Sequence, residues 1–269
     1  MAQRFSLEQI RERTYKTRDA WWTVWLVDPL ASRLVWLVSP VRWLTPNVLT
    51  FMAFVLGAGA AACFAQADHG WLIAGAVLFH VSFVFDCMDG KIARLKGNGS
   101  AFGSWLDYVF DRLRVTVCAV ALMGGQYARS GEFIYVWLAG VVIFLDMFRY
   151  LNHLQMDQVW KALRTSVGAP LEPDAMEENP DVAVKASFGP FAPLRGYLVR
   201  HRIRPHVFSG IEFQMFVFIV APLLGQIVVI TIASAALLIA FELLLILALY
   251  LATRRFAGRG DTDAQSITT

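Results

Sequence analysis

The sequence predicts an all-α polytopic membrane protein with six transmembrane helices, and two observations carry this prediction. Of its 269 residues, 57% are hydrophobic and 17% are charged, whereas soluble domains average about 25% charged and 45–50% apolar residues. The apolar residues also gather in blocks that approach the roughly 20 residues a helix needs to cross a hydrocarbon core. A soluble one- or two-domain enzyme is therefore excluded.

Six apolar blocks follow one another along the chain, and each is expected to form one membrane span. The last two blocks are contiguous, but Pro222, Gly225 and Gln226 supply the breakers for a tight turn between two helices. The expected spans are residues 48–67, 71–85, 105–124, 133–151, 207–225 and 227–252.

The basic residues predict the orientation of these spans, because Lys and Arg are retained on the cytoplasmic side. Of the 24 Lys and Arg, only Arg129 lies in a connection of the opposite side. Both termini are therefore expected in the cytoplasm (N-in/C-in). The expected location is the cytoplasmic (plasma) membrane.

The segment before the first span has the composition of a helix that lies in the membrane interface. Residues 6–9 offer a capping box for a charged helix, and residues 20–40 alternate tryptophans with polar residues, as interfacial helices do. We therefore divide the chain into an N-terminal and interfacial region (1–44), a six-helix catalytic domain (45–255) and a C-terminal tail (256–269). The domain holds a cytoplasmic connection at about 152–206, whose stretch 168–193 is rich in Pro and acids and is expected to be irregular.

Four aspartates lie at one end of the second and third spans. Asp86 and Asp89 are three residues apart and Asp107 and Asp111 four apart, so each pair shares one helix face. Glycines at 97 and 99 break the chain between the pairs. The four carboxylates are therefore predicted to meet at the cytoplasmic mouth of the bundle.

Such a cluster indicates a site for divalent cations. Acids within membrane segments are rare and usually functional, and four negative charges in a low dielectric repel one another. Two divalent cations would cancel them, and carboxylate oxygens suit Mg²⁺ or Mn²⁺. The alternative is that the aspartates cap helices or pair with the nearby cations, Lys91, Arg94, Arg112 and Arg114.

The pattern Asp86-x2-Asp89-Gly90-x2-Ala93-Arg94-x8-Gly103-x3-Asp107-x3-Asp111 resembles the signature of the CDP-alcohol phosphotransferase (CDP-alcohol phosphatidyltransferase) family of integral membrane enzymes. Residues 45–50 also resemble the family's entry to the first span. The resemblance implies a transferase for substituted phosphate groups (EC 2.7.8-type) in phospholipid biosynthesis. It also implies six spans, an interfacial helix and a homodimer.

The resemblance implies roles for individual residues. The four aspartates would hold two divalent metals, and Asp111 would also act as the general base on the acceptor hydroxyl. The expected contacts to the CDP-linked donor are Asn47, Thr50, Asp86, Gly90, Ala93, Arg94, Ser100 and Gly103, with the two glycines leaving room for the nucleotide.

The signature does not distinguish the substrates within the family. The favoured hypothesis is transfer of a phosphatidyl group from CDP-diacylglycerol to a polar alcohol, which releases CMP; the alternative is transfer of a phospho-alcohol from a soluble CDP-alcohol to a lipid or polyol. An acceptor that itself carries a phosphate would need cations, for which the candidates are Arg112, Arg149, Arg195, Arg200, Arg202 and Arg204. Retention on the cytoplasmic side explains these arginines equally well.

Three further acids lie within the spans, namely Asp146, Glu212 and Glu242. Asp146 and Arg149 are expected to form a local ion pair, and Glu242 is either an interhelical hydrogen-bond partner or a cavity-lining residue. An ion-coupled transporter with an acidic relay, a prenyl-transferring enzyme and a scaffold remain alternatives. None of these explains the spacing of Gly90, Ala93, Arg94 and Gly103.

Overall fold

Long helices account for almost all of the part of the chain that the computed structural model describes, which is residues 5–41, 43–166, 192–204 and 207–266. Within these residues the extended structure is limited to an isolated bridge between Asp19 and Ile203. The helices are α1 (Leu7–Thr14), η1 (Thr23–Val27), α2 (Asp28–Val38), α3 (Pro46–Ala65), α4 (His69–Lys96), α5 (Ala101–Ser130), α6 (Ile134–Ser166), α8 (Ala192–Arg200), α9 (Gly210–Met215), η3 (Phe216–Val220), α10 (Ala221–Leu224) and α11 (Ile227–Ser266). The predicted all-α class is confirmed over the described residues.

Helices occur at all six positions where spans are expected, but they differ in how well they suit a membrane. Four of them are long and apolar enough to cross it, namely α3, α4, residues Ile134–Leu163 of α6 and residues Ile227–Arg254 of α11. Helix α5 is as long, but it carries Asp107, Asp111, Arg112 and Arg114. The apolar unit Gly210–Leu224 is shorter. Six spans therefore remain a prediction.

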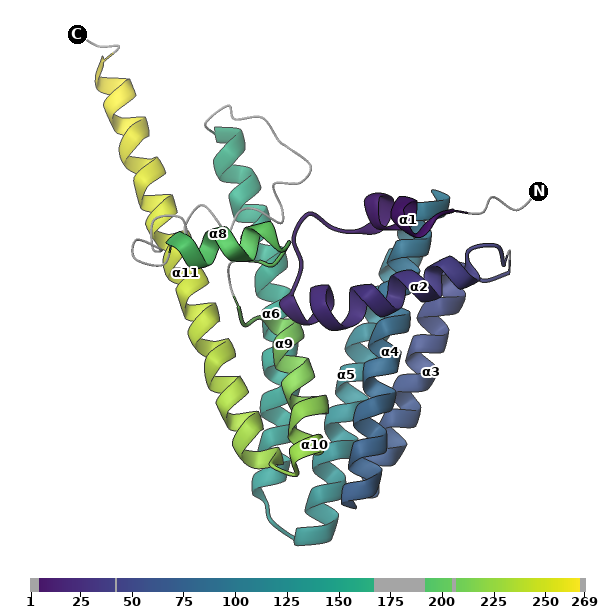
Figure 1. Cartoon of the computed structure of the whole chain (residues 1–269). Helices are drawn as coiled ribbons and strands as arrows, with labels where there is room; N and C mark the ends of the chain where they lie inside the picture. Colours follow the sequence, from purple (N-terminus) through teal and green to yellow (C-terminus); the bar gives the residue numbers. More distant parts are fainter. Residues whose placement is uncertain (1–4, 42, 167–191, 205–206, 267–269) are drawn as a thin grey trace.

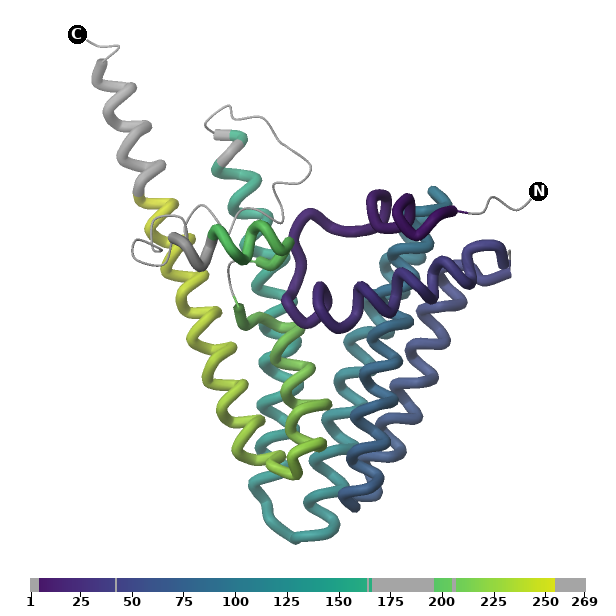
Figure 2. Tube along the Cα trace, viewed as in Figure 1, coloured from purple at the N-terminus to yellow at the C-terminus, as the bar shows by residue number. Residues whose placement is uncertain are grey.

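The connections between the helices lie at two opposite ends of a bundle (Figure 1). The turns between α3 and α4, α5 and α6, and α10 and α11 lie at one end, while α1, α2 and α8 lie at the other. Helix α11 extends to that second end, at which α1 also lies (Figure 2). Helix α1 and the C-terminal part of α11 therefore lie at the same end of the bundle. On which side of a membrane that end lies stays a prediction.

Local sequence explains where the bundle helices begin and stop. Thr45 and Asp68 cap α3 and α4 through their side-chain oxygens, which satisfies backbone donors that a helix start leaves open. Gly97 and Gly225 have φ of +63° and +64°, a conformation that costs glycine nothing. The predicted break after the second span and the turn at Gly225 are confirmed.

The N-terminal region also follows its sequence. Ser6 and Gln9 form the predicted capping box of α1, and α2 packs against α4 at the end of the bundle (Figure 1). Trp25 and Trp36 are half exposed, whereas Trp22 is buried. This placement suits an interfacial helix, which remains a prediction. The stretch 168–193 that we expected to be irregular lies almost wholly outside the described residues.

The core of the bundle contains a cluster of phenylalanine rings, and α11 exposes leucines on its outer face. Phe79 lies 4.7 Å and Phe64 lies 6.3 Å from Phe218, measured between ring centroids, so α3, α4 and η3 meet around one ring cluster. On α11, by contrast, Leu243 and Leu244 are more than 60% exposed. Helix faces of this kind suit contact with lipid hydrocarbon.

Candidate active site

A polar cavity of about 480 Å³ lies among α4, α5, α6 and α9. Carboxylates of α4 and α5 line it together with polar side chains of α6 and α9. The segment between α1 and η1, and the residues that precede α9, complete the lining. Every one of the four predicted aspartates reaches this cavity.

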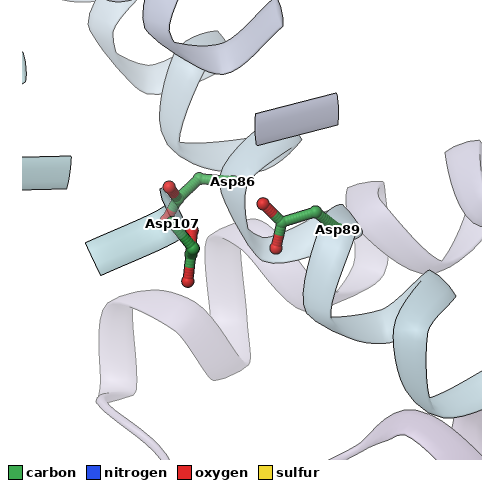
Figure 3. Close-up of side chains that lie close together, drawn as sticks. All are labelled: Asp86, Asp89 and Asp107. Atoms are coloured by element: carbon green, nitrogen blue, oxygen red, sulfur yellow. The ribbon is translucent and has the colours of Figure 1, made fainter. Parts of the chain in front are cut away.

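Three of the four aspartates form one cluster (Figure 3). Asp86, Asp89 and Asp107 each place a carboxylate oxygen within 4.8 Å of the other two. Helix α4 contributes two of these residues one turn apart, and α5 returns the third after the break at Gly97. The convergence predicted from the helical spacing is correct for these three residues.

Helix α3 holds the cluster through Thr50. The Thr50 hydroxyl donates to Asp89 Oδ2 at 2.5 Å and is itself buried. The hydroxyl lies 3.1 Å from the carbonyl oxygen of Pro46 as well, within its own helix. We expected Thr50 to contact the CDP-linked donor. In the structure it contacts a carboxylate of the cluster and fixes the direction of that carboxylate.

The fourth aspartate, Asp111, stands apart from the cluster because two guanidinium groups hold it. Arg112 donates to Asp111 Oδ2 at 2.6 Å, and Arg114 pairs with Asp111 Oδ1. Arg114 also lies 3.3 Å from Asp86, so it links the fourth carboxylate to the cluster. The expected set of four converging carboxylates is therefore a set of three beside a carboxylate paired with arginines.

The two signature glycines play different parts. A Cβ on Gly90 would approach only the flexible guanidinium of Arg94, at 3.5 Å, so Gly90 leaves the cavity wall open. A Cβ on Gly103 would lie 2.8 Å from Asn47 Oδ1 and 3.1 Å from Ser100 Oγ. Gly103 thus allows the start of α5 to approach α3.

Of the other residues expected to contact the CDP-linked donor, one lies in the cavity wall. Arg94 lines the cavity, and its Nε donates to the carbonyl of Thr14 at 3.1 Å. Ser100 instead caps α5 by accepting from the Gly103 amide at 3.0 Å. Ala93 lies beside Gly99 and is not among the residues that line this cavity.

The ion pair expected between Asp146 and Arg149 is wrong. Asp146 is bound by Arg112 at 2.5 Å and by Gln214 at 2.8 Å, because its side of α6 faces α5 and α9. Arg149 lies 3.1 Å from Glu242 of α11, and Asn152 donates to the same carboxylate at 2.6 Å. Glu242 is therefore an interhelical partner and does not line the cavity.

The arginines considered for an acceptor phosphate separate into groups. Arg112, Arg149 and Arg204 line the cavity, together with Lys16 and His153. Arg200 is exposed outside it. Arg202 contacts Asp28 at 3.3 Å, and the side chain of Arg195 lies outside the described residues.

Sequence reasoning missed the part played by Asp28. This carboxylate is 2% exposed and accepts a hydrogen bond from Lys91, a residue within the signature, at 2.7 Å. Asp28 stands in a stretch rich in tryptophan and leucine, and an acid in such surroundings needs a partner. The sequence therefore indicated that Asp28 has a partner, but it did not indicate which residue that partner is.

The region that contains this site is similar to known proteins. Residues 43–173 match the sequence model of a family described as CDP-alcohol phosphatidyltransferase. An archaetidylinositol phosphate synthase of Methanothermobacter thermautotrophicus is 31% identical over 101 residues, which are 38% of this chain and 46% of that protein. A phosphatidylinositol phosphate synthase of Corynebacterium glutamicum is 36% identical over 88 residues, 33% of this chain and 37% of that protein.

A third relative acts on another alcohol. A CDP-diacylglycerol–glycerol-3-phosphate 3-phosphatidyltransferase of Cereibacter sphaeroides is 33% identical over 85 residues, 31% of this chain and 38% of that protein. The matched region thus spans less than half the length of each of these three relatives. The matched family region contains α3, α4, α5 and α6, and therefore all four aspartates.

Proposed function

Because residues 43–173 belong to the CDP-alcohol phosphatidyltransferase family, we propose that the chain is a divalent-cation-dependent membrane transferase that releases CMP from a CDP-linked donor. The observation that carries the proposal is the cluster of Asp86, Asp89 and Asp107 in a polar cavity at one end of the bundle. The signature that supplies this cluster lies wholly inside the family match.

The three clustered carboxylates suit a divalent cation. Three carboxylates with oxygens within 4.8 Å of one another are hard oxygen ligands of the kind that Mg²⁺ and Mn²⁺ prefer. When bound, such cations would neutralise the donor pyrophosphate and polarise the transferred phosphoryl group. Asp86, Asp89 and Asp107 would hold them, with Thr50 fixing the orientation of Asp89.

Residues of this chain would accept the proton of the acceptor hydroxyl and hold the accepting carboxylate in place. The acceptor hydroxyl oxygen forms a bond to the β-phosphorus of the donor, and the bond from this phosphorus to the bridging oxygen breaks as CMP leaves. Asp111 lines the cavity and would take the hydroxyl proton. Arg112 and Arg114 hold its carboxylate in one direction, so the base is positioned before substrate arrives.

For the substrates we propose a phosphatidyl transfer from CDP-diacylglycerol to a phosphorylated alcohol. Arg149, Arg204 and Lys16 give the cavity a basic region, and cations of this type bind phosphate through charge-assisted hydrogen bonds. The names of the three relatives each contain a phosphorylated alcohol or its product. Transfer from a soluble CDP-alcohol to a lipid is the competing proposal.

A donor and acceptor panel tests the proposal. The purified full chain in lipid nanodiscs is supplied with Mg²⁺ or Mn²⁺, with CDP-diacylglycerol or CDP-alcohols, and with inositol 1-phosphate, glycerol 3-phosphate or their unphosphorylated alcohols. We expect CMP from CDP-diacylglycerol with a phosphorylated acceptor only. CMP from a soluble CDP-alcohol and diacylglycerol would favour the competing transfer, and no CMP from any combination would refute the proposed activity.

A further inference from the structure

Two segments far apart in the sequence are joined along the cavity wall. The amide of Asp19 donates to the carbonyl of Arg202 at 2.9 Å, and the amide of Arg204 donates back to the carbonyl of Asp19 at 3.0 Å. Trp21 Nε1 also donates to the carbonyl of Val207 at 2.9 Å. The segment between α1 and η1 is thereby fastened to the residues between α8 and α9.

Both segments supply cavity-lining residues. Lys16 and Asp19 come from the first, which leads to Thr23 at the start of η1, and Arg204 and Ser209 come from the second. Two of these residues are the cations Lys16 and Arg204. Their position in the cavity therefore depends on how the two segments sit together.

One side chain, that of Arg202, makes most of the side-chain contacts across the junction. Its guanidinium donates twice to the carbonyl of Lys16, at 3.1 and 2.8 Å, and lies 4.3 Å from the ring centroid of Tyr15. It also donates to Asp28 Oδ2 at 3.3 Å, while Lys91 of α4 occupies Asp28 Oδ1 at 2.7 Å. We call Asp28, Lys91 and Arg202 the Asp28 clamp, because it ties α2, the signature helix α4 and the α8–α9 connection together.

The backbone conformation of Arg202 indicates that neighbouring structure holds this residue in place. Arg202 has φ of +61°, a left-handed conformation that residues with a Cβ adopt at a cost. Such conformations persist where the neighbouring structure over-determines them, and they cluster at functional sites. Here the conformation lets the backbone carbonyl and the guanidinium of Arg202 take part in the same junction.

We propose that Arg202 is a positioning residue that, through the Asp28 clamp, holds the two segments as one unit and so sets the affinity of the cavity for the substrate that enters from water. The inference rests on the proposed function for its kinetic consequence. The carboxylate cluster is held separately, by the packing of α4 and α5 against α3 and by Thr50. Loosening the clamp therefore moves Lys16 and Arg204 without moving Asp86, Asp89 or Asp107.

The variant Arg202→Gln tests this directly, because it leaves the Lys91–Asp28 pair intact and strands no buried charge. We expect the KM for the phosphorylated acceptor to rise about tenfold, the order of one lost charge-assisted hydrogen bond, with kcat changed less than twofold. Arg202→Gly removes the same contacts while favouring the left-handed backbone, so it keeps the fold if the glutamine variant does not. Arg129→Gln, at the opposite end of the bundle and 59% exposed, is the control.

Hydrogen exchange of the full chain in nanodiscs supplies a readout that does not need activity. Both variants should speed exchange at the amides of Asp19 and Arg204 together, while α5 keeps the protection of the parent chain. Unchanged KM, a fall in kcat alone, or faster exchange in only one of the two segments would overturn the proposal. A parent chain that releases no CMP refutes the proposed function instead, and the exchange pattern then decides whether the clamp joins the segments.

Discussion

Thr50 shows at the scale of one residue how α3 contributes to chemistry located on α4. Its hydroxyl is the direct side-chain donor to Asp89, at 2.5 Å in a buried position. A partner that orients a metal-binding carboxylate affects affinity for the metal as well as activity. Thr50 is therefore more informative about the cation than an exposed polar residue would be.

Thr50→Val removes this donor and keeps the shape of the side chain. We expect the affinity for Mn²⁺ to fall about 10- to 100-fold, as is typical when an orienting partner of a metal ligand is lost. Binding of Mn²⁺ followed by electron paramagnetic resonance measures the change. Thr116→Val is the matched control, since that hydroxyl donates to the Arg112 carbonyl of its own helix at 2.9 Å; equal Mn²⁺ affinity in both variants would contradict the assignment.

Asp111 and Asp107 are one helical turn apart, yet the structure gives them different surroundings. Asp107 belongs to the carboxylate cluster, whereas Asp111 is held by Arg112 and Arg114. The even spacing of the signature does not reveal this difference, because the sequence does not show which carboxylate the arginines of the same helix choose. The four aspartates are therefore not equivalent: three form the cluster, and Asp111 is held by arginines.

Asp111→Asn and Asp107→Asn should therefore fail in different ways. We expect Asp111→Asn to lower the rate of CMP release about 10²- to 10⁴-fold, the usual contribution of a general base, while Mn²⁺ binding is retained. Asp107→Asn should lose both. Loss of Mn²⁺ binding in Asp111→Asn to the same extent as in Asp107→Asn would show that all four carboxylates are ligands.

At the scale of the helices, glycines set how closely α3 and α5 approach. A Cβ on Gly125 of α5 would lie 2.7 Å from the carbonyl oxygen of Ala65, at the end of α3, whereas a Cβ on Gly124 would meet nothing within 4 Å. Small residues at such contacts allow membrane helices to pack with their backbones close together. The two neighbouring glycines form a natural matched pair.

Gly125→Ala should destabilise the bundle and Gly124→Ala should not. Backbone atoms cannot yield as a side chain does, so we expect Gly125→Ala to cost about 1–3 kcal/mol, the usual range for overpacking. The unfolding midpoint in detergent, measured for both variants beside the parent chain, checks the difference. Equal midpoints for the two variants would show that α3 and α5 do not pack as described.

The elements were predictable where local chemistry decides them. Ser6 and Gly225 mark the ends of helices through a capping box and a left-handed turn, and both were expected from their neighbours in sequence. Side-chain pairing between helices was not predictable in the same way. Asp146 and Arg149 have the spacing of an ion pair on one helix, but each finds a partner on a different neighbouring helix, which depends on how α6 is rotated against α5 and α11.

At the scale of the whole molecule, the arrangement of connections predicts an experiment on topology. The α4–α5 connection lies at the end of the bundle where α1 and α2 lie, and the α5–α6 connection lies at the other (Figure 1). In a variant without its three cysteines, Asn98→Cys and Glu132→Cys should therefore react with an impermeant maleimide from opposite sides of sealed vesicles. Asn98 should be labelled from the cytoplasmic side, and labelling of both positions from one side would contradict six spans.

Composition and hydropathy predicted the class of the molecule, and the signature predicted the location of its site. They did not predict the wall of the cavity, because Lys16, Asp19 and Arg204 belong to segments almost 190 residues apart that meet through backbone hydrogen bonds. Asp28 likewise finds Lys91 only when α2 lies against α4. Contacts of this range follow from the assembled bundle, whereas the carboxylates follow from a local pattern.

The dependence of CMP release on a divalent cation tests the central claim most directly. The full chain in nanodiscs containing CDP-diacylglycerol, with a phosphorylated acceptor in excess, is titrated with Mg²⁺ or Mn²⁺ after treatment with a chelator. The account predicts no CMP without the cation, a rate that saturates as the cation is added, and no rescue by the cation in Asp107→Asn. CMP release that proceeds at full rate in the chelator, or in Asp107→Asn, would contradict a cation site formed by Asp86, Asp89 and Asp107.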